Sequence, residues 1–255
     1  MRPLVIIILF FFILSSCQQE KKEDTESFIF LERHGYIVDS YNGVSVYRLA
    51  DTGKIMHGYY VISNEYGKSE EFNVSEGILD GVNITFHDNN EMYSKTFYNK
   101  GRRHGEDLTY YQSGKLQKKT IYKNNILVGP QTHYFESGQI QTESKIKDEK
   151  VVESTSYDII GNIVSQRFIK DGRTITQSIK NGIVISEHID SNYDDFDAMK
   201  FYNSKGEVEM FLRMYDNGNT RFLIELDENE NEIKRINIKE NPQKILEYQQ
   251  YLSRL

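Results

Sequence analysis

Alternating apolar and polar residues from Gly58 to about residue 238 predict a series of short β-strands. The stretch 105–129 shows the unit most clearly. Gly114 follows an aromatic pair by three residues, and Asn125 comes eleven positions after Gly114. Gly and Asn tolerate positive φ, so they mark the two turns of a β-hairpin unit.

This hairpin recurs along the chain. Its first turn falls at 23- or 24-residue intervals, at Gly67, Asn90, Gly114, Gly138 and Gly161. Its second turn falls at Gly77, Gly101, Asn125, Glu149 and Gly172. The spacing predicts an all-β fold, an elongated and twisted antiparallel meander of repeated β-hairpins over residues 58–238.

The side chains repeat with the turns. Ser and Thr recur four and six residues after the first turn, at Ser94, Thr96, Thr120, Thr142, Ser144 and Ser165. Simple alternation places them on one apolar face, together with the residues at two and eight and with the strand tyrosines Tyr110 and Tyr134. The adjacent Tyr111 and Phe135 then point to the other face. We expect them to form an exposed aromatic stripe there, a candidate binding surface for a protein or a glycan.

The pattern resembles the variant MORN repeat of bacterial proteins, many of which are described as antitoxin-like. The resemblance rests on the elements Tyr134 to Gly138 and Tyr122 to Asn125, and on His57-Gly58 and His104-Gly105, which match the usual start of such repeats. It covers roughly residues 50–235 and implies a repeat-built sheet. It says almost nothing about activity.

Residues 1–16 read as a lipoprotein signal peptide. Arg2 precedes an unbroken apolar run, Leu4 to Leu14, and Leu14-Ser15-Ser16-Cys17 resembles a lipobox. The run is shorter than the ~20 residues of a membrane-spanning helix but suits a signal peptide. Cys17 is the only cysteine of the chain. We therefore expect its acylation and attachment to a bacterial membrane; an ordinary secretory signal is the alternative.

The remaining segments flank the repeats. Residues 17–27 are polar and charged and predict a flexible tether, whose charges also resemble a surface-export signal. Gln18 favours the outer membrane. Residues 28–57 predict strands that form an irregular first edge of the sheet and cap it. In residues 239–255, Asn241, Pro242 and the helical spacing of the apolar residues predict a short amphipathic α-helix that covers one end.

The sequence shows little catalytic chemistry. Its six histidines lack zinc-ligand spacing, and it contains neither a phosphate-binding loop nor a Gly-x-Ser-x-Gly motif. The stretch Asp227 to Asn231 starts like a calcium loop but lacks the required Gly and the final Glu. The loop Asp190–Asp197 carries four Asp and could bind a cation, although a solvated acidic loop explains it better. We expect no enzyme, no cofactor and no metal.

Charge argues against nucleic acid as a partner. Without residues 1–16 the chain has 30 Lys and Arg against 38 Asp and Glu, a formal charge of −8. The sequence thus favours a lipid-anchored envelope protein whose repeat sheet serves as a non-catalytic scaffold for an unidentified protein. The alternatives are an immunity or antitoxin-like role against one toxin, or glycan binding.

Overall fold

The computed structural model describes residues 28–41, 44–190 and 196–255. In this part of the chain, 18 strands form one long sheet, and β2 and β3 form a separate hairpin. The large sheet contains β1 (Phe28–Glu32), β4 (Gly58–Asn64), β5 (Gly67–Ser75), β6 (Ile78–Phe86), β7 (Met92–Asn99), β8 (Arg102–Tyr110), β9 (Leu116–Lys123), β10 (Ile126–Leu127), β11 (Gln131–Tyr134), β12 (Ile140–Lys147), β13 (Lys150–Tyr157), β14 (Ile163–Lys170), β15 (Arg173–Lys180), β16 (Ile183–Ile189), β17 (Phe196–Tyr202), β18 (Val208–Asp216), β19 (Arg221–Leu226) and β20 (Glu232–Asn237). The separate hairpin consists of β2 (Tyr36–Tyr41) and β3 (Val44–Leu49).

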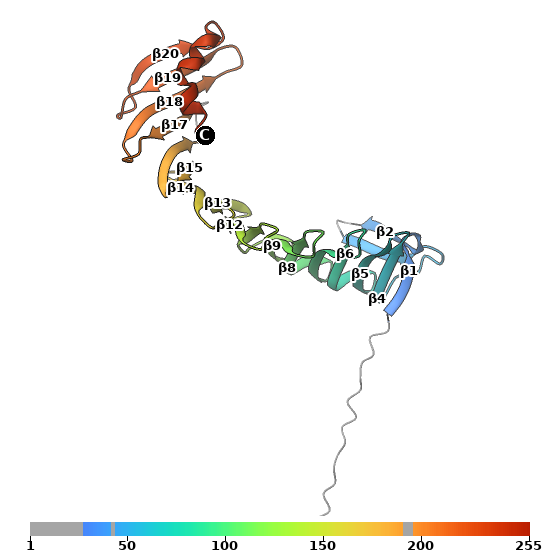
Figure 1. Cartoon of the computed structure of the whole chain (residues 1–255). Helices are drawn as coiled ribbons and strands as arrows, with labels where there is room; N and C mark the ends of the chain where they lie inside the picture. Colours follow the sequence, from blue (N-terminus) through green and yellow to red (C-terminus); the bar gives the residue numbers. More distant parts are fainter. Residues whose placement is uncertain (1–27, 42–43, 191–195) are drawn as a thin grey trace, which may run out of the picture.

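The predicted all-β meander is confirmed. From β4 to β9 and from β11 to β20, each strand pairs antiparallel with the next along the chain. The exception is β1, which pairs with β4 in parallel and makes the sheet mixed. The ribbon is elongated and bends along its length (Figure 1).

Two kinds of turn alternate, as their residues dictate. At the second turn of each unit both central residues have positive φ, for example Asn124 (52°) and Asn125 (71°). This is the geometry of a type I′ hairpin turn. At the first turn, the Tyr111 N–H donates to the Lys115 carbonyl and the Gly114 N–H donates to the Tyr111 carbonyl. The same pair of bonds recurs in the turns that begin at His87, Phe135, Asp158, Asn203 and Asp227.

The meander has one local break, between β10 and β11. Strand β9 pairs with β10 at one end and with β11 at the other. Between them, Val128 and Gly129 donate to the Ile121 carbonyl, and Pro130 has no N–H to offer. A side chain at Gly129 would bring its Cβ within 2.6 Å of the Ile121 Cβ, so only Gly fits here.

The sequence pattern predicted that the strands of residues 28–57 form an edge of the sheet, and this is only partly right. Only β1 does; β2 and β3 fold over one face of β4–β7. Tyr36 of β2 joins Met56, Tyr60 and Phe72 in a buried cluster, and Tyr47 packs against it. Burying these aromatic rings favours the folded-over position, which alternation along the strands cannot reveal.

A second cap covers the other end of the sheet. Residues 239–255 form a 3-10 helix, Pro242–Tyr248, and then α1, Gln249–Leu252, so the predicted α-helix is only four residues long. The predicted Asn241 cap is also wrong: its side chain makes no capping hydrogen bond. Tyr248, the last residue of the 3-10 helix, and Tyr251 and Leu252 of α1 pack against the sheet.

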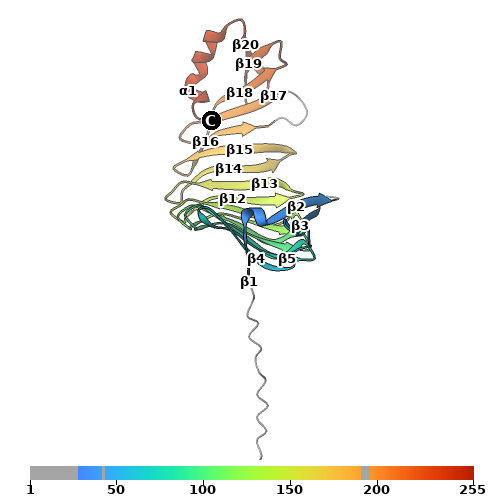
Figure 2. The ribbon, with the colours of Figure 1, turned by 90° about the vertical axis from the view of Figure 1, so that its right-hand side faces the viewer.

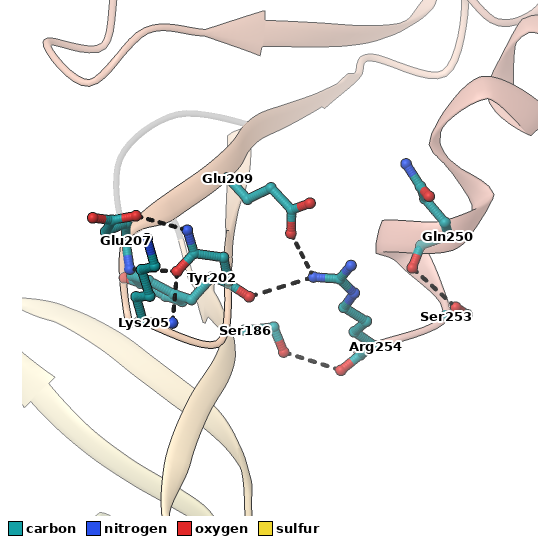
Figure 3. Close-up of polar contacts among 9 residues, drawn as sticks. Ser186, Tyr202, Lys205, Glu207, Glu209, Gln250, Ser253 and Arg254 are labelled. Atoms are coloured by element: carbon teal, nitrogen blue, oxygen red, sulfur yellow. Dashed lines mark hydrogen bonds and ion pairs between the residues drawn. The ribbon is translucent and has the colours of Figure 1, made fainter.

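The C-terminal cap is held by apolar packing and by its last residues. Tyr248 is buried with Phe201, Leu212, Leu223 and their neighbours. Figure 3 shows the tail: Ser186 Oγ donates to the Arg254 carbonyl at 3.0 Å, and the Arg254 guanidinium contacts Glu209 at 3.0 Å and the Tyr202 carbonyl at 3.4 Å. On the opposite face of the same strands, a smaller cluster buries Ala198, Phe211, Ile224 and Leu226.

In both views the β2–β3 hairpin lies towards one end of the stacked strands and α1 towards the other (Figures 1 and 2). No helix in the described ranges combines the length and apolar character needed to cross a membrane.

Candidate interaction surface

The two caps lie on the same face of the sheet, which we call the inner face because Figure 1 shows it on the inside of the bend. Directly paired residues share a face, so the face can be followed from strand to strand. From Phe72, in the N-terminal cluster, it runs through Asn83, Thr96, Asp107 and Thr120. Beyond the break it continues through His133, Thr142, Ser156, Ser165, Ser178 and Ser186 to Phe201, in the C-terminal cluster.

Between the caps this face consists largely of small hydroxyl side chains that bond across strands. Thr85 and Ser94 lie 2.6 Å apart through their hydroxyls, and Thr142 and Ser156 lie 3.1 Å apart. The hydroxyl of Thr96 donates to the Asp107 carboxylate at 3.0 Å. These mutual bonds fix the side chains, so the surface is ordered before any partner arrives.

The predicted row of Ser and Thr on one face is confirmed, but the placement of the strand tyrosines is wrong. Thr109 pairs with Lys118 and Tyr110 pairs with Leu116, which leaves Gln117 as an extra residue. This is a β-bulge. It places Tyr110 and Leu116 on the outer face, opposite to Thr120, and the same shift recurs before Phe86, Tyr134, Tyr157 and Tyr202.

On the outer face two of these tyrosines donate hydrogen bonds to acidic side chains. The Tyr157 hydroxyl donates to Glu143 at 3.2 Å, and the Tyr202 hydroxyl donates to Glu187 at 2.6 Å. Burial and the hydrogen bond to the Glu187 carboxylate raise the pKa of Tyr202 above its ordinary value. Hydrogen bonds therefore hold Tyr157 and Tyr202 against the outer face of the sheet.

Tyr111 and Phe135 do not form an exposed stripe on the outer face. Each directly follows the last residue of a strand, β8 or β11, where the turn begins, and both are half-buried. The Tyr111 hydroxyl donates to the Tyr134 carbonyl at 2.7 Å and so links one repeat to the next. His87 makes the equivalent contact with the Tyr110 carbonyl at 3.2 Å. A binding role for Tyr111 and Phe135 stays a prediction.

Charged groups interrupt the hydroxyl rows of the inner face. Arg103 lies 4.0 Å from the centre of the Tyr122 ring and pairs with Asp107 at 3.5 Å. Lys118 lies opposite His133. Burial, together with the Lys118 charge, lowers the pKa of His133 below its ordinary value. The centre of the inner face therefore carries the charged donors Arg103 and Lys118 beside the neutral hydroxyl donors.

One cluster in the described ranges has metal-ligand chemistry, and it lies at the acidic loop. His188 Nδ1 faces Asp190 at 3.1 Å, and Nε2 faces Asp197 at 3.6 Å. One ligand atom from each of the three residues lies within 4.8 Å of the others, a spacing that would allow all three to contact one ion. Arg167 lies 4.0 Å from Asp190 and competes for its charge. The other two Asp of this loop lie outside the described residues, and its cation binding stays a prediction.

Some of this could have been found from sequence and some could not. His188 lies in β16 and Asp190 directly follows this strand, two residues later, so their proximity has a local signal, whereas the contact with Asp197 depends on the fold. The Ser186 contact with Arg254 joins residues 68 apart and has no local signal. Cys17, the predicted site of lipid attachment, lies outside the described residues.

Comparison with known families supports the repeat assignment. The family model described as MORN repeat variant matches residues 103–124 and 127–148. These ranges correspond to β8 with β9 and to β10 through β12. No curated protein sequence matches the chain. The chain therefore contains two MORN-variant repeats, and such repeats suggest a binding scaffold built from repeats.

Proposed function

We propose that this protein is a lipoprotein of the bacterial envelope, anchored through Cys17, and that its repeat sheet is a non-catalytic scaffold for a protein partner. The outer membrane is the membrane we expect. The observation that carries the scaffold role is the inner face, which is covered by the chain itself at both ends and by nothing within the described residues in between.

The geometry of this face suits binding better than catalysis. Its Ser and Thr hydroxyls engage one another, the Asp107 side chain and backbone carbonyls. The histidine that most often activates a hydroxyl nucleophile is not among these contacts. Side chains that are already ordered lose little freedom on binding, which favours a partner that lies along the ribbon.

Two adjacent residues of one strand allow a direct test, because they occupy opposite faces of the sheet. Ser154 lies on the inner face and Thr155 on the outer face of β13, and both are half-buried. A photoreactive amino acid would replace each in turn in the full chain in cells. We expect Ser154 to cross-link one dominant protein and Thr155 to cross-link none.

The controls separate the scaffold from the anchor. A Cys17→Ala chain carrying the same probe should lose the partner and leave the membrane fraction. Equal cross-linking from both faces, or cross-linking from Thr155 alone, would contradict the inner-face assignment. A Cys17→Ala chain that remains membrane-bound would contradict the anchor.

A glycan is the second candidate partner. The inner face offers rows of hydroxyls together with the ring of Tyr122, one side of which Arg103 covers, and sugars commonly bind where hydroxyls lie beside an aromatic ring. Cross-linking from Ser154 to polysaccharide rather than protein would favour this alternative.

A further inference from the structure

The first strand of the sheet exposes large apolar side chains. In β1, Phe28 is 52% exposed and Phe30 is 74% exposed. Among the described residues, β1 is hydrogen-bonded on one side only, to β4. An exposed apolar edge strand invites contact with another surface.

The register places these rings together on the outer face. Phe28 lies opposite Tyr59 and Phe30 opposite Val61. The rings of Phe28 and Tyr59 meet edge to face with their centres 5.3 Å apart. We call Phe28, Phe30, Tyr59 and Val61 the β1 patch.

The other end of the sheet is protected differently. Strand β20 carries ion pairs: Arg235 pairs with Glu232 of the same strand, and Lys234 pairs with Glu247 at 3.0 Å. Charged side chains are a common device against edge contacts. In β1 the only charged residue is Glu32, at its end. The contrast indicates that the β1 patch has an occupant.

The length of chain before β1 indicates which occupant. Ten residues separate Cys17 from Phe28. Fully extended, ten residues span at most ~35 Å, so the lipid anchor proposed above holds the patch close to the bilayer. Phe side chains bind readily at the boundary between headgroups and acyl chains.

We propose that the β1 patch contacts the interfacial layer of the membrane that holds Cys17, with Phe28 and Phe30 inserted among the lipids. This inference rests on the proposed anchor. The Lys68 ammonium beside the patch is paired with the Glu71 carboxylate. The contact therefore needs no anionic lipid.

The single cysteine of the chain makes a clean experiment possible. Once Cys17 carries lipid, Phe30→Cys introduces the only free thiol. The lipidated chain with a nitroxide label at position 30 would be bound to phosphatidylcholine vesicles. Ile233→Cys is the matched control, since Ile233 of β20 is 62% exposed at the opposite end of the sheet. Substituting either exposed side chain leaves the buried clusters untouched.

We expect the label at position 30 to be accessible to oxygen and shielded from a water-soluble nickel chelate, at low and high salt alike. The label at position 233 should show the reverse. Equal aqueous accessibility at both positions on vesicle-bound protein would overturn the membrane contact while leaving the anchor intact. Strong spin coupling between labels at position 30 would identify a second copy as the occupant and would also overturn it. A chain that does not float with the vesicles would overturn the anchor and this inference together.

Discussion

The turn between β12 and β13 should become more stable when Glu149 is replaced by Gly. Asp148 and Glu149 occupy its two central positions with φ of 51° and 60°. The equivalent turns place Gly or Asn at the second position, as at Asn125 and Gly172. Among the second positions of these turns, Glu149 is thus the one where a β-carbon is held in the left-handed region without the local hydrogen bonding that Asn offers.

The size of the gain follows from two opposing effects. Holding a residue that has a β-carbon in the left-handed region costs about 1–2 kcal/mol, and the greater freedom of Gly in the unfolded chain offsets about 0.5–1 kcal/mol of that. The free energy of unfolding of the Glu149→Gly chain should therefore be about 0.5–1 kcal/mol higher than that of the native chain. With a urea dependence of about 2 kcal/mol per molar, its midpoint should rise by about 0.3–0.5 M.

Urea unfolding followed by circular dichroism would measure this shift. Glu149→Ala is the control, because it removes the carboxylate but keeps the β-carbon and its backbone restriction. We expect the Ala chain to match the native chain. If the Gly and Ala variants behave alike, relief of backbone strain is not the cause. If the Gly variant is less stable, the reasoning is refuted.

Three further changes test packing and ionisation. Gly129→Ala should destabilise the break in the sheet by about 1–3 kcal/mol, because its Cβ would lie 2.6 Å from the Ile121 Cβ; an unchanged urea midpoint would contradict this close approach. Because the pKa of His133 is lowered in the folded state, the unfolded chain binds a proton at higher pH, and stability should be lost as the pH falls below about 6.5. His133→Gln should lessen that loss in urea titrations between pH 7 and pH 5. An identical pH profile for the two chains would count against this assignment. Burial, with the nearby Glu70 carboxylate, raises the pKa of Tyr47 to about 12, so the stability that the protonated Tyr47 contributes should be lost as the pH rises above about 10. Tyr47→Phe should therefore shift alkaline unfolding to higher pH. Unfolding of the variant at lower pH than the native chain would contradict the assignment.

The regular part of the fold could be predicted because its signals are local. Each second turn needs residues that accept positive φ, and Gly77, Gly101, Asn125 and Gly172 all adopt it. The spacing of these residues fixes the strand lengths between them, and the strand lengths fix the meander. Glu149 stands where the other units have Gly or Asn, yet it also adopts positive φ, because the strands on either side of it impose the same turn.

The faces were harder to predict, because one unpaired residue reverses the alternation. Gln117 carries no feature that marks it as the extra residue of a bulge, yet it moves Tyr110 to the face opposite Thr120. Both caps also escape sequence patterns. The contact of Tyr36 with Phe72 joins distant segments, and only packing decides which face of the sheet the hairpin covers.

The uneven distribution of buried apolar residues has a dynamic consequence. In the described ranges, the buried apolar residues run from Tyr36 to Leu79 and from Ile175 to Tyr248; between Leu79 and Ile175 the buried residues are Thr96, Thr120 and Ser144. In that middle section the hydrogen-bond ladder and the turns must therefore hold the strands with little help from a hydrophobic core. A sheet whose units contact mainly their neighbours can open locally.

Hydrogen exchange should therefore be faster in β8–β14 than in β5 or β18, and it should slow in β8–β14 when the partner of the inner face binds. Peptides that cover each strand would report this by mass spectrometry. Uniform exchange along the ribbon would show that the ladder alone is as stabilising as the capped ends. Protection on binding that appears only in β5 or β18 would place the partner on the caps instead. If the middle does gain the protection, the uncovered hydroxyl face is the part of the sheet that its partner completes.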